Sequence, residues 1–252
     1  MAYKPKVDAK LYDRRYFEKE CGGHEEFQKS HGKVLTPWNQ EALEKAKLEP
    51  GMRVLDIGCG RGEVIYQCSQ KGTESTGLDY ANEALEFAKQ FRDQSGKVSD
   101  YRLVQASAMN LPFSEEYFNR VFMLDIVEHL YPYELQKALS EVYRVLKPDG
   151  ILIIHTMPNL NYYRWGYPIY RLANRFIGKR LPKNPRERWY HGGVHVNEQT
   201  VYSLRKSLMA IGFSSVKIWL KQISGNRLKK IISNIFPLKY ILANDIIAVV
   251  KK

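Results

Sequence analysis

The chain has 252 residues, of which 44% are apolar and 26% are charged, and its formal net charge is +12. This length is too short for two independent enzyme domains and predicts one catalytic domain with added segments. Three cysteines without a C-x-x-C pair indicate neither a disulfide framework nor a zinc site, and no stretch approaches the roughly eighteen apolar residues of a membrane span, so we expect a soluble protein of the reducing cytoplasm.

Strand and helix patterns alternate along the chain, which favours an α/β fold with a mostly parallel sheet and helices on both faces. A helical cap over residues 1–50 comes first. The expected strands run, in chain order, over residues 54–57, 75–78, 101–104, 120–124, 151–156, 216–220 and 244–250. The expected helices run over residues 38–47, 83–92, 132–146 and 198–211. We assign the core to residues 1–157 and 196–252, with insertions at residues 158–195 and 222–242.

The first strand leads into a glycine-rich segment that reads Val-Leu-Asp-Ile-Gly-Cys-Gly-Arg-Gly-Glu over residues 54–63. Its glycines let the backbone turn sharply and approach a ligand, and Asp56 stands at the strand end as a hydrogen-bond acceptor. A dinucleotide loop would need a glycine where Glu63 stands, and no G-K-[ST] of a phosphate loop follows. A ligand with an amino group and no phosphate therefore fits this loop better.

This segment resembles the D-x-G-x-G loop of the class I S-adenosylmethionine-dependent methyltransferases, which holds the methionine end of the cofactor. The resemblance implies a Rossmann-like sheet of seven strands, the last inserted antiparallel, and S-adenosylmethionine as cofactor. It also implies cofactor contacts for five residues of the loop: Asp56, Gly58, Cys59, Gly60 and Gly62.

Two later strand ends complete the expected cofactor site. Asp79 ends the second strand at roughly the 20-residue offset at which such folds place an acid on the ribose hydroxyls. In the resembled family this acid grips both ribose oxygens, and the next residue, Tyr80, lies against the adenine. The turn after the third strand resembles the family's adenine-binding turn, with Ser107 where the family usually has an acid. Its contact residues would be Ser107, Ala108 and Met109.

Residues 124–130 read Leu-Asp-Ile-Val-Glu-His-Leu, at the end of the fourth strand and beside the cofactor. Spacings of three and four bring Asp125, Glu128 and His129 to one side of a helical turn, and His195 ends the first insertion. Two carboxylates and two imidazoles would suit Mg²⁺ or Mn²⁺, which lowers the pKa of an acceptor hydroxyl.

A metal-free alternative uses His129 or His195 as general base, with Asp125 near the methionine amino group. A purely structural alternative has Glu128 capping a helix and His129 hydrogen-bonded in its first turn. The pattern resembles the small-RNA 3′-terminal 2′-O-methyltransferases and the ubiquinone-type (type 11) O-methyltransferases. The segment Thr156-Met-Pro-Asn159 resembles both as well, although Asp125 is a shorter acid than the RNA enzymes carry.

The positive charge lies in the second part of the chain. Residues 1–149 contain 21 Lys and Arg against 24 Asp and Glu, whereas residues 150–252 contain 18 against 3, a net charge of +15. The insertion at 158–195 mixes aromatic and basic residues, so we expect a lid over the acceptor that stacks on a base, a sugar or an aromatic acceptor, or lies at a lipid headgroup layer. Its aromatic residues are Tyr162, Tyr163, Trp165, Tyr167, Tyr170, Phe176, Trp189 and Tyr190. An ordinary lid whose aromatics pack on each other is the alternative.

In the second insertion, residues 227–236 set four apolar residues on one helical face: Leu228, Ile231, Ile232 and Ile235. Three basic residues lie off that face: Arg227, Lys229 and Lys230. Such a helix rests on anionic lipid or covers the core of its own domain. Because most amphipathic helices cover a core, we expect the second arrangement.

Three functions remain open. The favoured one is methylation of a hydroxyl on a small, glycosidic or lipid-linked acceptor, metal-assisted or not, with the basic half facing an anionic acceptor or a membrane surface. The second is an RNA 2′-O-methyltransferase, which basic charge supports but for which no separate RNA-binding domain is evident. The third is a non-catalytic cofactor-binding module.

Overall fold

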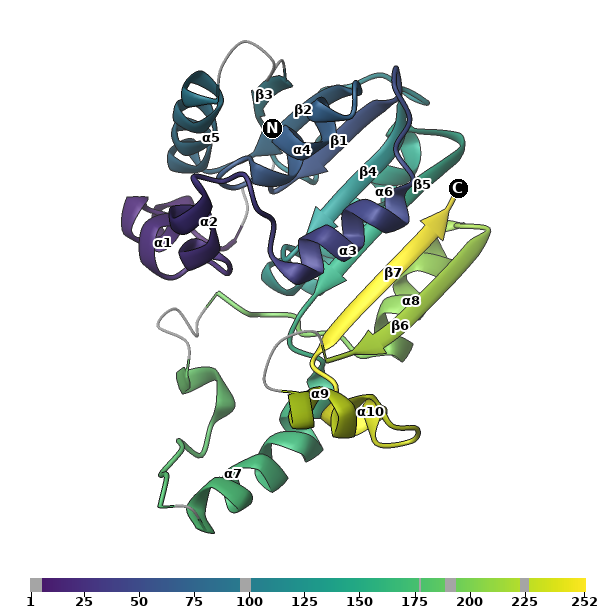
Figure 1. The fold of residues 1–252 in the computed structure, drawn as a ribbon. Helices are drawn as coiled ribbons and strands as arrows, with labels where there is room; N and C mark the ends of the chain where they lie inside the picture. The colour runs from purple at the N-terminus through teal and green to yellow at the C-terminus, as the bar shows by residue number, and fades with distance from the viewer. Residues whose placement is uncertain (1–5, 96–100, 177, 189–193, 223–226) are drawn as a thin grey trace.

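A computed structural model describes residues 6–95, 101–176, 178–188, 194–222 and 227–252. One sheet of seven strands runs through the molecule in the order β3-β2-β1-β4-β5-β7-β6 (Figure 1). All neighbours pair in parallel except β7, which is antiparallel to both β5 and β6. The expected Rossmann-like α/β fold with an antiparallel last strand is confirmed.

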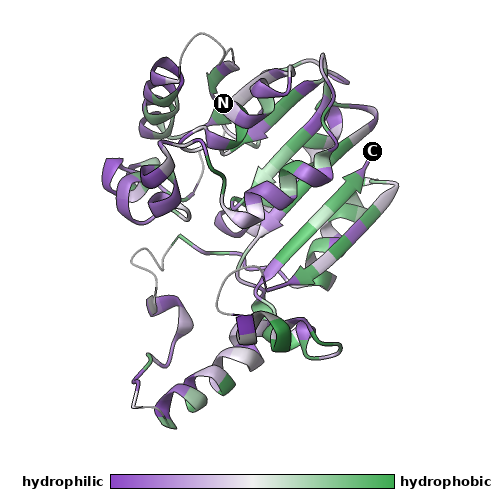
Figure 2. Ribbon diagram, in the orientation of Figure 1, coloured by the Kyte–Doolittle hydropathy of each residue, from purple (hydrophilic) through white to green (hydrophobic). Residues whose placement is uncertain are grey.

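Each expected strand is present, with ends that differ by a few residues. The bounds are β1 Arg53–Ile57, β2 Glu74–Asp79, β3 Tyr101–Gln105, β4 Phe118–Leu124, β5 Leu146–Thr156, β6 Ser215–Lys221 and β7 Asp245–Lys251. The central strands are apolar on both faces because both faces are covered, as Figure 2 shows in green. The parallel carboxyl ends of β1, β2 and β4 meet at one edge, where a site is expected.

Helices cover both faces of the sheet. On one face, α3 (Pro37–Ala46) and α4 (Glu63–Gln70) bury apolar residues against the side chains of Val54, Phe122 and Ile153. On the other, α6 (Pro132–Val145) and α8 (Val201–Ile211) pack with a core that includes all the strands except β3. Helix α5 (Asn82–Gln94) packs beside α4 through the ring contact of Tyr66 with Phe91.

The N-terminal segment forms a cap at the carboxyl edge of the sheet. It contains η1 (Ala9–Leu11), α1 (Arg14–Lys19) and α2 (His24–Ser30). Its residues Val7, Tyr12 and Phe17 form a small cluster with Ala81 and Ala84 at the start of α5. The cap is therefore held to the end of β2, where the cofactor residues lie.

The first insertion extends away from the body of the molecule (Figure 1). It comprises the π-helical turn η3 (Tyr162–Gly166), α7 (Tyr167–Phe176) and η4 (Pro185–Arg188). The tyrosines of its first half contact one another, as expected of an ordinary lid, and Tyr162 and Tyr167 are buried. Trp165 and Phe176 are exposed, and the expected aromatics Trp189 and Tyr190 lie outside the described residues.

The second insertion contains α9 (Arg227–Asn234) and α10 (Lys239–Leu242). The expectation that its apolar face covers the core is wrong for the side chains that the structure describes, since Ile231, Ile232 and Ile235 are exposed. Ser233 instead faces inward. In the described parts of the chain, no helix has both the length and the apolar character needed to cross a bilayer.

Candidate active site

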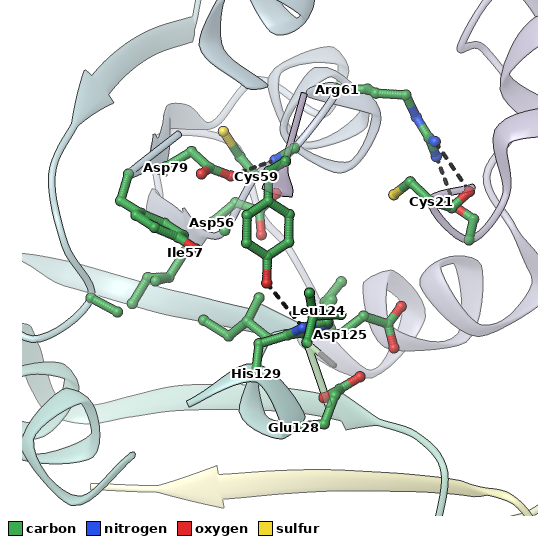
Figure 3. Close-up of a pocket in the computed structure, with 18 of the residues that line it drawn as sticks. Cys21, Asp56, Ile57, Cys59, Arg61, Asp79, Leu124, Asp125, Glu128 and His129 are labelled. Carbon is green, nitrogen blue, oxygen red and sulfur yellow. Dashed lines mark hydrogen bonds between the residues drawn. The ribbon is translucent and has the colours of Figure 1, made fainter. Parts of the chain in front are cut away.

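A cavity of about 440 Å³ opens at the carboxyl ends of β1, β2 and β4 (Figure 3). Most of the expected cofactor residues line it: Asp56, Gly58, Cys59, Gly60, Asp79, Tyr80, Ser107, Ala108 and Asp125. Two do not. Gly62 caps α4 with a φ of 85° and packs against Ala88, and Met109 is buried with 1% of its surface exposed. Both residues pack inside the protein and support the loops that line the cavity.

The glycine loop is shaped by its contacts to the next strand end. The N–H groups of Gly58 and Cys59 both donate to the carbonyl of Leu78. Gly58 has a φ of 74°, and a Cβ there would lie 2.4 Å from Ile126 Cγ2, so only glycine fits. The N–H of Gly60 donates to Asp79 Oδ2 over 3.1 Å. The loop and Asp79 therefore form one unit.

Asp56 and Asp79 are buried carboxylates at the cavity wall (Figure 3). Burial raises the pKa of Asp56 well above its usual value, and the charges of Glu63 and Asp79 add to the effect. Burial also raises the pKa of Asp79, to about 6, although the N–H groups of Ala81 and Gly60 oppose the shift. A cationic ligand with hydroxyl donors would relieve the repulsion between these groups, and the ammonium, sulfonium and ribose of S-adenosylmethionine have that character.

The carboxylate of Glu63 is paired with a guanidinium group, because Arg61 Nη2 lies 2.7 Å from its Oε1. Arg61 is almost fully buried and points to the cap (Figure 3), where it donates to the carbonyls of Phe17 and Gly22. The pKa of Arg61 is raised despite its burial, chiefly by the charges of Glu63 and Cys21. The loop arginine thus ties the glycine loop to the N-terminal cap.

Asp125 has a different environment from the one that its spacing predicts. Its φ is 55°, in the left-handed region, and its two oxygens contact side chains other than those of Glu128 and His129. Trp38 Nε1 donates to Asp125 Oδ2 over 3.0 Å, and His155 Nδ1 lies 2.6 Å from Oδ1. Both oxygens are engaged, although 34% of the side chain remains exposed toward the cavity.

His155 was not singled out in the sequence, although a histidine inside the apolar strand of residues 151–156 has to find a polar partner. It is fully buried, and its Nε2 lies 3.3 Å from Asp245 Oδ1 at the start of β7. Burial alone would lower the pKa of His155, but the charge of Asp125 and the bonds to both carboxylates raise it to about 10. The same contacts, with Trp38, hold the pKa of Asp125 below its usual value against the effect of burial. Asp125, His155 and Asp245 form a chain of charged groups that is buried at His155 and Asp245 and partly exposed at Asp125.

Glu128, His129 and His195 come together as expected. One candidate ligand atom from each lies within 4.8 Å of the others, and among the residues that the structure describes this is the group that could hold a metal ion. Asp125 is not part of it. The backbone N–H groups of Val196 and Asn197 donate to the carbonyl of Glu128, which brings the end of the first insertion to the η2 turn (Val127–His129).

Burial shifts the pKa values of the residues in this group. Burial, then the nearby charge of Asp125, raises the pKa of Glu128, whose Oε2 accepts from Thr156 Oγ1 over 2.7 Å. Burial, then the neighbouring His195, lowers the pKa of His129 to about 3. Burial lowers the pKa of His195 as well. Both imidazoles therefore favour the neutral form, which has a lone pair for a proton or a metal ion.

Most of the cover of the cavity comes from the cap, and the first insertion contributes Val194 and His195 at its end. The cap residues that line it include Val7, Tyr12, Tyr16, Phe17, Cys21 and Trp38. None of the described residues between 158 and 188 does so. The Tyr12 hydroxyl lies 3.0 Å from His129 Nδ1, and the Tyr12 ring contacts Tyr80. Tyr12 therefore reaches both the adenine side and the acceptor side, a link that the spacing of residues along the chain does not reveal.

This fold, with its glycine loop joined to Asp79 at the end of β2, is the fold of the class I S-adenosylmethionine-dependent methyltransferases. Comparison with known proteins agrees, because a family model described as "Methyltransferase domain" matches residues 55–154. An uncharacterized methyltransferase of Synechocystis is 36% identical over 117 residues, which cover 46% of this chain and 52% of that one. The ubiquinone biosynthesis O-methyltransferase of Bartonella bacilliformis is 34% identical, over 53% of this chain and 51% of that one.

A solved structure, a SAM-dependent methyltransferase from Archaeoglobus fulgidus, superposes with a TM-score of 0.53. It is 25% identical in sequence, and the match covers 85% of this chain and 94% of that one. The chain spans about half the length of the two curated relatives above. The comparisons thus indicate a methyltransferase domain, and the side chains that line the cavity bear on the acceptor.

Proposed function

We propose that the protein transfers the methyl group of S-adenosylmethionine to a hydroxyl of a small, glycosidic or lipid-linked acceptor. The observation that carries the proposal is the group formed by Glu128, His129 and His195 at the wall of the same cavity that Asp56 and Asp79 line. Methyl transfer from a sulfonium is an in-line displacement whose electrophile is already activated. The protein has mainly to align the acceptor and remove its proton.

The two sides of the cavity would divide this work. On the cofactor side, Asp79 accepts from the ribose hydroxyls, and Asp56 with the glycine loop holds the methionine end. On the acceptor side, Glu128 in its ionised form would be the stronger base, because burial raises its pKa, whereas the lowered pKa of His129 makes that imidazole a weak base. Tyr12, which contacts His129, orients that imidazole.

The same three residues fit a divalent metal ion. Two imidazoles and one carboxylate would supply three ligands, and this set would suit Mn²⁺ better than Mg²⁺ because Mg²⁺ prefers oxygen ligands. A bound ion would lower the pKa of the acceptor hydroxyl. Mn²⁺ titration followed by electron paramagnetic resonance would test this, since Glu128→Gln should weaken binding of the ion itself and Asp125→Asn should not.

The name of one relative, the ubiquinone biosynthesis O-methyltransferase of Bartonella bacilliformis, supports an oxygen atom as the acceptor. The test is transfer of a labelled methyl group to a panel that contains a lipid-linked catechol, an alkyl glycoside, a primary amine and a short RNA. We expect label on the hydroxyl compounds, and a fall of at least about 100-fold in kcat in Glu128→Gln with unchanged affinity for S-adenosylhomocysteine. Labelling of the amine alone would overturn O-methylation, and labelling of the RNA alone would favour the 2′-O-methyltransferase.

A non-catalytic module would bind the cofactor and label no acceptor class. The cavity is lined by more carboxylates than the cofactor would contact, and a module that only binds the cofactor would not need the others. Wild-type protein that binds S-adenosylhomocysteine tightly and never turns over would support it.

A further inference from the structure

Helix α7 exposes an apolar stripe that nothing in the described chain covers. Trp165, just before the helix, is 63% exposed, and Phe176 at its end is 83% exposed. Ile169 and Leu172 between them are also exposed. The spacing of four, three and four residues places all four on one side of a helix, so they form one continuous surface, which we call the α7 stripe.

Basic residues border this stripe. Arg164, Arg171 and Arg175 each precede a residue of the stripe by one position, and all three are exposed. One step along a helix is about 100°, so the guanidinium groups flank the apolar side rather than oppose it. Lys179 and Arg180 continue the basic border beyond the helix, and both are exposed. Residues 158–195 carry eight Lys and Arg against one acid, a net charge of +7.

The opposite side of α7 is held by contacts within the insertion, and the α7 stripe remains exposed to solvent. Tyr167 is buried, and its hydroxyl donates to the carbonyl of Pro182 on the returning segment. Asn174 is buried as well. The inner side of α7 therefore packs on its own insertion, and Figure 2 shows hydrophobic and hydrophilic residues alternating along the helix.

A second exposed apolar surface adjoins the base of α7. Gly166 lies against α10, since a Cβ there would come within 2.4 Å of the carbonyl oxygen of Ile241. Around α9 and α10, six apolar or aromatic residues are exposed: Ile231, Ile232, Ile235, Phe236, Leu238 and Tyr240. Residues 222–242 contain four Lys and Arg and no acid. Both insertions thus combine exposed apolar side chains with an excess of positive charge.

We propose that these two insertions dock on the surface of an anionic lipid bilayer, with the α7 stripe entering the headgroup layer. Exposed Trp, Ile, Leu and Phe beside Arg and Lys is the composition of an interfacial amphipathic helix. An RNA partner would be met by the same charge, but it offers no place for four aliphatic and aromatic side chains in a line. The charge complementarity therefore favours anionic lipid.

The proposal goes beyond methyl transfer and does not require it. If both hold, a lipid-linked acceptor would reach the cavity from the docked side, because the first insertion leaves the body after Met157 and returns at Val194 and His195, and all three line the cavity. A docked insertion would keep that rim close to the bilayer.

Vesicle flotation tests the docking without any acceptor. Wild-type protein should float with vesicles of phosphatidylcholine and phosphatidylglycerol in equal parts, and much less with phosphatidylcholine alone. The double variant Leu172→Glu with Phe176→Glu should bind the anionic vesicles at least about tenfold more weakly, because two apolar side chains are lost and two negative charges are added. Binding by wild type should also weaken as salt is raised.

A matched control lies on α8. Tyr202 and Met209 are exposed to similar extents on that helix, 76% and 54%, so Tyr202→Glu with Met209→Glu makes the same change of charge away from both insertions. This variant should keep most of its vesicle binding. Equal loss in both variants would show a general charge effect and overturn the assignment to α7, as would equal binding to both kinds of vesicle.

Two further outcomes would also overturn the docking. If wild type forms a dimer that the α7 variant cannot form, the stripe is an interface between two copies, which sedimentation equilibrium would reveal. If a short RNA competes fully with anionic vesicles and binds the α7 variant as well as wild type, the positive surface serves nucleic acid. Failure of the flotation test leaves the methyl-transfer assay unaffected, so the two proposals fail separately.

Discussion

The cofactor side and the acceptor side of the cavity both place carboxylates at strand ends, but the two sides satisfy them differently. Asp79 accepts hydrogen bonds from backbone N–H groups of the loops around it, so these bonds form when the loops fold. Asp125 and Glu128 are held instead by side chains, namely those of Trp38, His155 and Thr156. Both carboxylates keep lone pairs for a ligand, but the position of Asp125 depends on side chains from two other segments of the chain.

The largest effect that tests this difference is expected at His155. His155→Leu would leave Asp125 and Asp245 buried without their shared cation, and removal of one partner from a buried ion pair costs about 3–5 kcal/mol. The free energy of unfolding, from urea denaturation, should fall by about that amount. A fall of under 1 kcal/mol would show that Asp125 is not held by this chain of charges.

On the cofactor side, Asp79→Asn should leave the fold intact and weaken the affinity for S-adenosylhomocysteine by about 10- to 100-fold, because a hydrogen bond to a charged group is lost. Calorimetric titration would measure it. The wild-type affinity should also fall as the pH drops through about 6, since the protonated carboxyl accepts fewer hydrogen bonds. Asp79→Asn should lack this pH dependence, and an equal dependence in the variant would assign the effect to another group.

A smaller effect is expected for Trp38→Phe, which keeps an aromatic ring beside His155 but removes the donor to Asp125 and some of the volume of the indole. We expect a loss of about 1.5–3 kcal/mol in the free energy of unfolding. Trp219→Phe on β6 is the matched control, because that ring lies half-exposed beside Lys45, and it should cost under about 1 kcal/mol. Equal losses in the two variants would argue that the indole contributes only its size.

The smallest effect is expected at Ser107. Its hydroxyl accepts from the backbone N–H of Met109 and so belongs to the local turn. Ser107→Ala should change the affinity for S-adenosylhomocysteine by less than about threefold. A larger loss, seen in the same calorimetric titration, would mean that the hydroxyl contacts the adenine directly, as the family's acid does in the resembled turn.

The sequence was sufficient for the sheet and for most of the cofactor side. The seven strands are short apolar runs ended by glycine, proline or polar residues, and periodicity of that kind is local. The glycine loop and Asp79 also follow from residues close in the chain, because the loop is folded by its own glycines and by the end of the adjacent strand.

The acceptor side could not be predicted as well, because its contacts join distant segments. Trp38 and Asp125 are 87 residues apart, Tyr12 and His129 are 117 apart, and His155 and Asp245 are 90 apart. The bonds of Asp125 to Trp38 and His155 have no sign in its spacing of three from Glu128. The apolar face of α9 was misjudged for a related reason, since amphipathicity does not specify what a helix meets.

The antiparallel insertion of β7 bears on the order in which the site can be completed during synthesis. Strand β7 follows β6 in the chain yet lies between β5 and β6, so β6 has no partner in the sheet until β7 has been made. Until then His155 has one of its two carboxylates and waits for Asp245. In a nascent chain released only to β6, the residues that form the glycine loop are already present. His155 beneath the acceptor side would still lack the carboxylate of Asp245 until β7 has been made.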